Sequence, residues 1–100
     1  MDMIKVSVKG KNEIVVEGDL RSIEDYVNIR DAINSLISDG AKDIYVDLVS
    51  SKTIMSSVLG FFMKLINHEK VAVHIKVGSP ELFKSLQSMH LLDIFDVKMR

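Results

Sequence analysis

The fold is decided by residues 43–60, which read DIYVDLVSSKTIMSSVLG. The part from Ile44 to Leu48 is a short apolar strand pattern with an acidic residue near its end. A connector follows, and the pair Ser56-Ser57 then opens a very hydrophobic helix that we expect to run from about Ser57 to His68. Because the first N–H groups of a helix lack partners within it, a serine hydroxyl here is either a simple cap or a modification site that a partner reads.

Strand and helix patterns alternate along the rest of the chain. Strand patterns cover 4–8, 13–17, 43–49 and 71–77, and a short last strand is expected near 96–98. Ser22 is expected to start a helix whose apolar stripe begins at Ile23 and which ends at Asp39-Gly40. Ser79-Pro80 starts another helix, over 81–89. This β-β-α-β-α-β-α-β order predicts an α/β fold. Its small mixed sheet is mostly parallel, with the hairpin at one edge and helices mainly on one side.

Composition limits the classes of protein that this chain can represent. With 100 residues we expect one domain over 1–100, and 13 basic against 14 acidic residues give a net charge of −1. No basic block is present, which argues against a nucleic-acid binder. The absence of cysteine excludes disulfides, thiolate catalysis and cysteine-based zinc sites. No signal-peptide pattern or apolar run of membrane-spanning length is visible, so we expect a cytoplasmic protein without direct membrane insertion.

The sequence offers little catalytic chemistry. His68, His74 and His90 lie far apart on different expected elements, without the spacing of a metal site, and are interpreted as surface or interface residues. There is no Gly-rich phosphate loop and no Gly-x-Ser-x-Gly nucleophile turn. We therefore expect a non-enzymatic protein with no catalytic residues, no metal and no cofactor.

Four segments, in order, resemble the STAS domain family, which includes the bacterial anti-sigma factor antagonists. Residues 18–20 resemble its Gly-Glu-Leu-Asp stretch, and residues 44–50 its Val-Leu-Asp-Leu-Ser strand. Residues 53–60 resemble its Phe-Ile-Asp-Ser-Ser-Gly-Leu-Gly junction, and residues 89–95 its closing Thr-Gly-Leu-Asp-x-x-Phe, with one residue more. The order and spacing of these segments over nearly the whole chain carry the resemblance.

The resemblance implies a phosphorylated regulator of bacterial transcription that works by partner switching. A kinase-type anti-sigma factor would phosphorylate the serine that aligns with Ser57, and a phosphatase would reset it. Ser56 is the neighbouring candidate; either serine is expected to cap the helix while the other is exposed in the first turn. Two alternatives stay open: a subunit that docks constitutively on an ATPase or transporter of membrane-transport machinery, and a domain that senses a nucleotide or lipid. The apolar helix also leaves self-association open.

The chain departs from the family pattern next to the serine pair. Met55 replaces the Asp before the pair, Val58 the Gly after it, and Arg21 the Asp of the Gly-Glu-Leu-Asp stretch. Family geometry implies that Met55 and Val58 are exposed, and apolar residues there favour a constitutive partner. The expected partner-binding residues are Asp19, Arg21, Ser22, Met55, Ser56, Ser57, Val58, Leu59 and Phe62.

Overall fold

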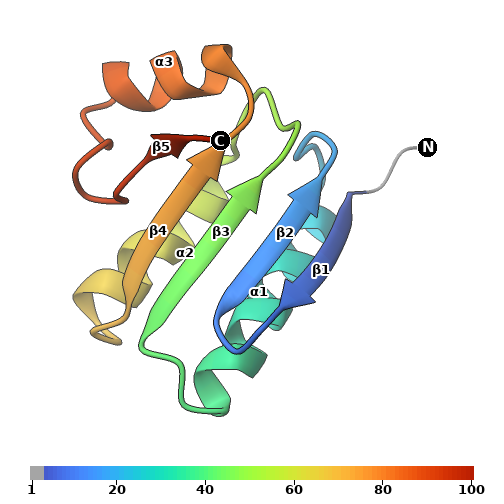
Figure 1. The fold of residues 1–100 in the computed structure, drawn as a ribbon, viewed down its shortest axis with the longest axis vertical. Helices are drawn as coiled ribbons and strands as arrows, with labels where there is room; N and C mark the ends of the chain where they lie inside the picture. The colour runs from blue at the N-terminus through green and yellow to red at the C-terminus, as the bar shows by residue number, and fades with distance from the viewer. Residues whose placement is uncertain (1–3) are drawn as a thin grey trace.

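The computed structural model describes residues 4–100. Their strands form one five-stranded sheet in the order β1-β2-β3-β4-β5. Its strands are β1 (Lys5–Lys9), β2 (Glu13–Glu17), β3 (Asp43–Leu48), β4 (Ala72–Val77) and β5 (Lys98–Met99). β1 pairs with β2 antiparallel, and every later pair is parallel. The predicted mixed sheet with its hairpin at one edge is therefore confirmed (Figure 1). The last strand begins two residues later than predicted.

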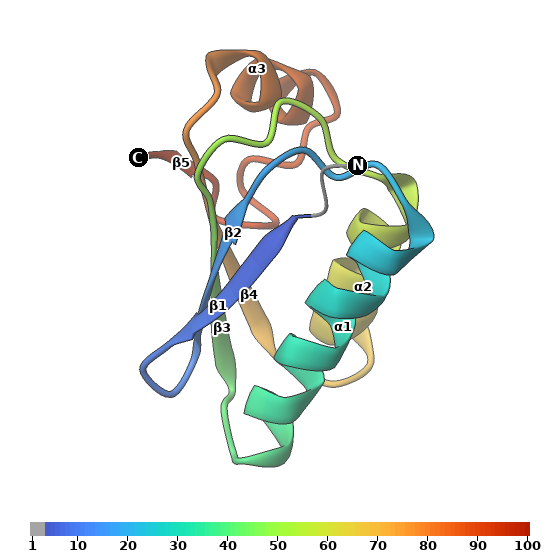
Figure 2. The same ribbon diagram turned by 90° about the vertical axis from the view of Figure 1, so that its right-hand side faces the viewer.

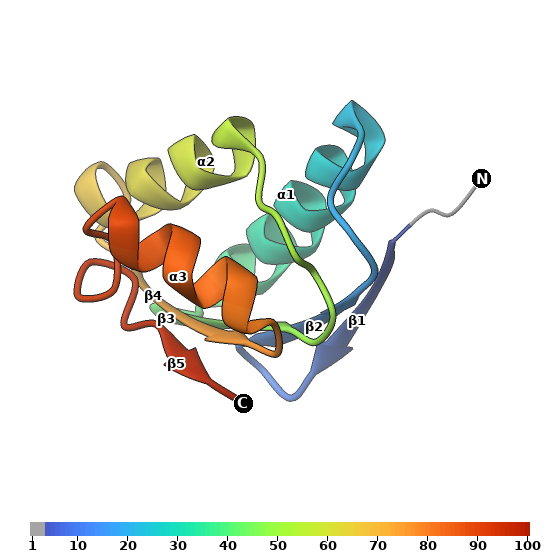
Figure 3. The same ribbon diagram turned by 90° about the horizontal axis from the view of Figure 1, so that it is seen from above.

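Two of the three helices cover one face of this sheet. Helices α1 (Ile23–Ser38) and α2 (Ser56–Asn67) lie side by side against it, and the opposite face carries no helix in the described chain (Figure 2). The third helix, α3 (Pro80–Ser88), lies across the end of the sheet where β3 and β4 finish (Figure 3). The carboxyl ends of the parallel strands β2, β3 and β4 and the starts of the helices therefore meet at the same end of the molecule. No helix in residues 4–100 is long and apolar enough to span a membrane.

The core lies between the sheet and the two covering helices. Alternate strand residues point toward the helices because side chains in a strand alternate between faces. The buried set includes Ile14, Val16, Ile44, Val46, Leu48, Val73, Ile75 and Val77 from the sheet, and Ile29, Ile33, Phe62 and Leu65 from the helices. The intervening strand residues lie on the open face, which is mostly polar and charged.

The helix starts confirm two predicted caps and overturn a third. Ser22 begins α1 with a capping box: its Oγ accepts from the N–H of Asp25, whose carboxylate accepts from the N–H of Ser22. Ser79 caps α3 through the N–H of Leu82. The N-cap of α2 is Met55, so neither Ser56 nor Ser57 is the cap.

The physical reason is that the chain enters α2 one residue earlier than the serine pattern suggests. Met55 has extended backbone angles, and its carbonyl already accepts from the N–H groups of Val58 and Leu59. Ile54 and Met55 are half-buried against the core, which fixes the chain at this point. Ser56 and Ser57 therefore occupy the first two positions of the helix, and both are exposed.

Candidate functional site

Two loops far apart in sequence are hydrogen-bonded into one platform at the helix-start end of the molecule. Ser50 Oγ accepts from the N–H of Gly18 at 2.9 Å, and Ser51 Oγ donates to the Gly18 carbonyl at 2.6 Å. Asp19 Oδ1 accepts from the N–H of Lys52 at 2.8 Å. Residues 18–21 and 50–52 thus form a single surface, in which residues 18–20 and Ser50 belong to two of the segments that carried the sequence resemblance. We call this surface the loop platform.

Gly18 is the position where the platform requires glycine. Its φ of +103° lies in the left-handed region, which L side chains rarely adopt. The two serines that follow β3 differ in environment: Ser51 is fully buried, whereas Ser50 is exposed. Their role is not visible in the sequence, because their partners lie more than 30 residues away.

The charged residues of the platform are partly engaged with one another. Arg21 lies 3.3 Å from Asp19 through a guanidinium nitrogen, with its side chain 72% exposed. The N–H of Lys52, with help from Arg21, holds the pKa of Asp19 below its ordinary value. Asp19 is therefore a carboxylate at neutral pH that is already occupied by donors, while most of the Arg21 side chain remains open to a partner.

Asp25 anchors this end of α1 from inside. Its carboxylate accepts from the backbone N–H groups of Arg21 at 2.9 Å and Ser22 at 3.1 Å, and from that of Ile4 at 3.4 Å. Burial opposes ionisation of Asp25, but these donors outweigh it and its pKa is lowered. The buried face of α1 consequently begins at Asp25 and continues through Ile29 and Ile33.

Ile23 lies outside that face, and the expectation that it starts the apolar stripe is wrong. Its side chain is 76% exposed at the first position of α1, directly after Arg21 and Ser22. The sequence pattern missed it because an apolar residue near a helical period is normally assigned to the core. Ile23 is therefore an apolar side chain that is exposed to solvent next to the loop platform.

Helix α2 presents only part of its predicted partner surface. Val58 and Phe62 are 1% and 0% exposed, so their expected exposure is wrong. They lie four residues apart, on the side of the helix that packs on the sheet. Met55 and Leu59 are half-buried on the flank, whereas Ser56 and Ser57 are exposed. Within the described residues, no side chain caps the start of α2, and the first turn of α2 holds no acidic residue.

Ser57 also lines a groove between α1 and α2. The groove has a volume of about 480 Å³, and Tyr26, Arg30, Gly60 and Lys64 are among its other lining residues. The Arg30 guanidinium lies over the Tyr26 ring, 5.6 Å from its centroid. Two cationic side chains and the acidic Glu69 therefore share a groove with the exposed serine. No local sequence pattern predicts this groove, because α1 and α2 meet only in the folded chain.

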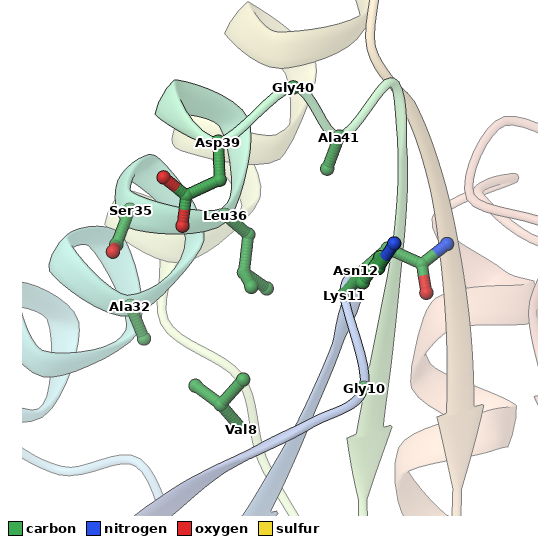
Figure 4. A pocket seen from close by; sticks show the side chains of 10 residues that line it. All are labelled: Val8, Gly10, Lys11, Asn12, Ala32, Ser35, Leu36, Asp39, Gly40 and Ala41. Atoms are coloured by element: carbon green, nitrogen blue, oxygen red, sulfur yellow. The ribbon is translucent and has the colours of Figure 1, made fainter.

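A wider pocket of about 790 Å³ lies at the opposite end of the molecule. It opens between the β1–β2 turn and the end of α1 (Figure 4), and Val8, Lys11, Asn12, Ser35 and Asp39 are among its lining residues. None of the predicted site residues lines it. The residues singled out by the sequence therefore gather at the other end, around the loop platform.

The fold is similar to the folds of two proteins of known structure. The chain aligns over 97% of its length with 87% of the anti-sigma factor antagonist SpoIIAA in its unphosphorylated form, at 20% identity and a TM-score of 0.67. It aligns over 99% of its length with 82% of the protein TM1081, at 14% identity and a TM-score of 0.68. No protein-family model and no curated protein sequence matches the chain. The comparisons thus confirm the predicted fold at the level of structure.

Proposed function

We propose that this chain is a non-enzymatic interaction module of a partner-switching pathway. In its unmodified form it would capture a kinase-type anti-sigma factor. Phosphorylation of Ser57 would release that partner, and a phosphatase would restore binding. The observation that carries the proposal is the exposed Ser57 in the first turn of α2, at the same end of the molecule as the loop platform, in a fold similar to that of an anti-sigma factor antagonist.

The surroundings of Ser57 are compatible with a phosphate. A phosphoserine adds about −1.5 to −2 charges at neutral pH. The start of a helix stabilises negative charge, and the first turn of α2 has no acidic side chain to repel it within the described residues. Arg30 and Lys64 line the same groove as Ser57. The domain would therefore tolerate the modification, whereas a partner seated on this surface would meet a new charge.

Ser57 is preferred over Ser56 because only Ser57 lines the groove between α1 and α2. The proposed partner surface keeps Asp19, Arg21, Ser22, Met55, Ser56, Ser57 and Leu59 and adds Ile23. Val58 and Phe62 support it from below by packing α2 on the sheet. Ile23 is the apolar anchor of this surface, since a large exposed side chain at the centre of an interface contributes most to affinity.

The direct test combines binding and phosphate incorporation. The purified chain is incubated with ATP and a kinase-type anti-sigma factor from the same genome, and phosphosites are mapped by mass spectrometry. We expect one phosphate on Ser57, none in Ser57→Ala, and unchanged incorporation in Ser56→Ala. Ile23→Ser is expected to weaken binding without changing the melting temperature, because the Ile23 side chain is 76% exposed. A chain that binds no such kinase, or that is phosphorylated elsewhere, contradicts the proposal.

A constitutive partner is the second candidate, favoured by the apolar side chains at this surface. Met55 is half-buried beside the serines and Ile23 is largely exposed, so a stable apolar contact is available without any modification. A transport ATPase or transporter would be such a partner. Co-purification that is unchanged by Ser57→Asp would favour this candidate over the switch, because a charge at position 57 would then be irrelevant to binding.

A further inference from the structure

His74 lies on the open face of the sheet and bridges two carboxylates. Its Nδ1 lies 2.8 Å from Asp96 Oδ2, and its Nε2 lies 3.0 Å from Asp43 Oδ1. The Tyr45 ring stacks on the imidazole, with 4.4 Å between ring centroids and 13° between planes. The His74 side chain is only 24% exposed. The His74 ring is thus held by Tyr45 on one face and by a carboxylate at each nitrogen, whereas the ring of an isolated surface histidine is free to rotate.

One of the two carboxylates belongs to the segment that closes the sheet. Residues 91–100 follow the edge of β4, where β5 pairs through Lys98 and Met99 only (Figure 1). Few backbone hydrogen bonds join this segment to β4, among them those from the N–H of Ile75 to the Phe95 carbonyl and from the N–H of Arg100 to the Val77 carbonyl. Asp96 has a φ of +45°, in the left-handed region, which aspartate adopts more readily than most side chains. The Asp96 carboxylate, and not only the short strand pairing, therefore joins this segment to β4 through His74.

The protonation state of His74 decides whether both carboxylates have a donor. An imidazolium carries N–H groups on both nitrogens, whereas neutral imidazole carries only one. Deprotonation therefore leaves one nitrogen lone pair facing either Asp96 or Asp43. One of the two contacts must then weaken, whichever tautomer forms.

The charged and titratable groups around His74 come from β2, β3, β4 and the closing segment. Asp43 and Tyr45 of β3 and Asp96 of the closing segment contact the ring. Glu13 of β2, Asp47 of β3, Lys76 of β4 and Lys98 of the closing segment share with His74 a small cavity of about 100 Å³, and Asp47 is paired with Arg100. Lys98 also lies 3.8 Å from Asp96. Burial lowers the pKa of His74, but the hydrogen bonds and charges of Asp96 and Asp43 outweigh burial, so its pKa is raised above the ordinary 6.5.

We propose that His74 is a pH-sensitive latch that fastens residues 91–100 to the edge of β4. In the protonated state it joins both carboxylates and keeps the edge covered. In the neutral state with its proton on Nε2, it keeps Asp43 and releases Asp96, which loosens the segment and opens the edge of β4. Because the pKa of His74 is raised in the folded chain, the latch is fully closed below about pH 6.5 and opens as pH rises through the folded value.

The test follows the His74 ring and the edge of β4 by NMR across the pH range 5.5–9. The ring is expected to titrate above 6.5, and the hydrogen-exchange protection factors of the Ile75 and Arg100 amides are expected to fall through the same pH range. Protection factors are used because they remove the intrinsic pH dependence of exchange. His74→Gln is expected to give low protection at these two amides at every pH. His68→Gln, at the exposed end of α2, is the matched control and should leave the wild-type pH profile unchanged.

Asp96→Asn keeps the result interpretable if His74→Gln fails to fold. It removes one carboxylate, so the pKa of His74 should fall and the Ile75 amide should lose protection even at pH 6. A His74 ring that titrates at or below 6.5, or protection at Ile75 that is independent of pH, overturns the proposal.

Discussion

Arg100 Nε donates to Asp47 Oδ1 at 2.7 Å, which joins the last residue of the chain to the central strand β3 across 53 positions. Asp47 lies on the open face of the sheet, yet its side chain is only 10% exposed. The closing segment 91–100 is thus held on this face by two contacts, Arg100 to Asp47 and Asp96 to His74. Both contacts are made by ionisable side chains, and they add to a strand pairing that covers only two residues.

Removing Arg100 should therefore destabilise the fold. Arg100→Ala leaves the Asp47 carboxylate shielded from water without this donor, and we expect a loss of about 1–3 kcal/mol in the free energy of unfolding. Urea denaturation at pH 7 measures it. The double variant Asp47→Asn, Arg100→Ala should recover part of the loss, since no buried charge remains. A single variant as stable as wild type would show that water satisfies Asp47.

Ser51 should be more important for stability than its neighbour Ser50. Ser51 is fully buried and donates to the Gly18 carbonyl, so Ser51→Ala is expected to cost about 1–3 kcal/mol. Ser50 is exposed, and water can replace its oxygen as the acceptor for the Gly18 N–H. Ser50→Ala should then cost about 0.5–1 kcal/mol. Equal losses in thermal denaturation of the two variants would contradict the assigned roles.

The capping carboxylate of Asp25 should give the chain an acid-sensitive component of stability. Its pKa is lowered from 3.8 in the folded chain, so its contribution is present above that pH and is lost as pH falls through the folded value. Asp25→Asn is expected to cost about 1–2 kcal/mol at pH 7, and the difference from wild type should shrink below pH 3.8. Denaturation curves from pH 2 to pH 7 measure this trend. Asp31→Asn, at an exposed pair on the same helix, should show no such trend.

Local sequence signals predicted the elements and two of the three caps. Strand alternation and the caps Ser22 and Ser79 depend on neighbours within a few residues, so the strands and these two helix starts can be predicted from the sequence. The mostly parallel sheet with its hairpin at one edge followed from the alternation of strands and helices, because short right-handed crossovers leave few topologies. Two segments of the resemblance, 18–20 and 44–50, also lie together through the hydrogen bond from the Gly18 N–H to Ser50 Oγ, which no local pattern encodes.

The orientation of side chains on the helices was harder to predict. Helix α2 is apolar on several sides, so its sequence did not show which side packs on the sheet, and Val58 and Phe62 were placed on the wrong one. Ile23 fits a helical stripe, but the buried position at the start of α1 belongs to Asp25, whose backbone donors are fixed only in the fold. His74 meets Asp43 and Asp96 across 31 and 22 residues, a contact that spacing rules do not detect.

Gly60 offers a test of both helix stability and the groove beside Ser57. It lies inside α2 with ordinary helical geometry, and an added Cβ would meet nothing within 4 Å. Gly60→Ala should therefore stabilise the fold by about 0.5–1 kcal/mol, since alanine loses less backbone entropy than glycine in a helix. Because Gly60 lines the groove between α1 and α2, the same methyl group should weaken binding of a partner that enters the groove.

Gly40→Ala is the matched control for this substitution. Its Cβ would also meet open space, but its φ of +108° is a conformation that alanine disfavours, so the control should be destabilised by about 1 kcal/mol. Thermal denaturation of both variants gives the stability, and titration calorimetry with the captured partner gives the affinity. A destabilised Gly60→Ala would mean that the groove is closed in solution. A stabilised variant with unchanged affinity would place the partner on the loop platform alone, away from the groove.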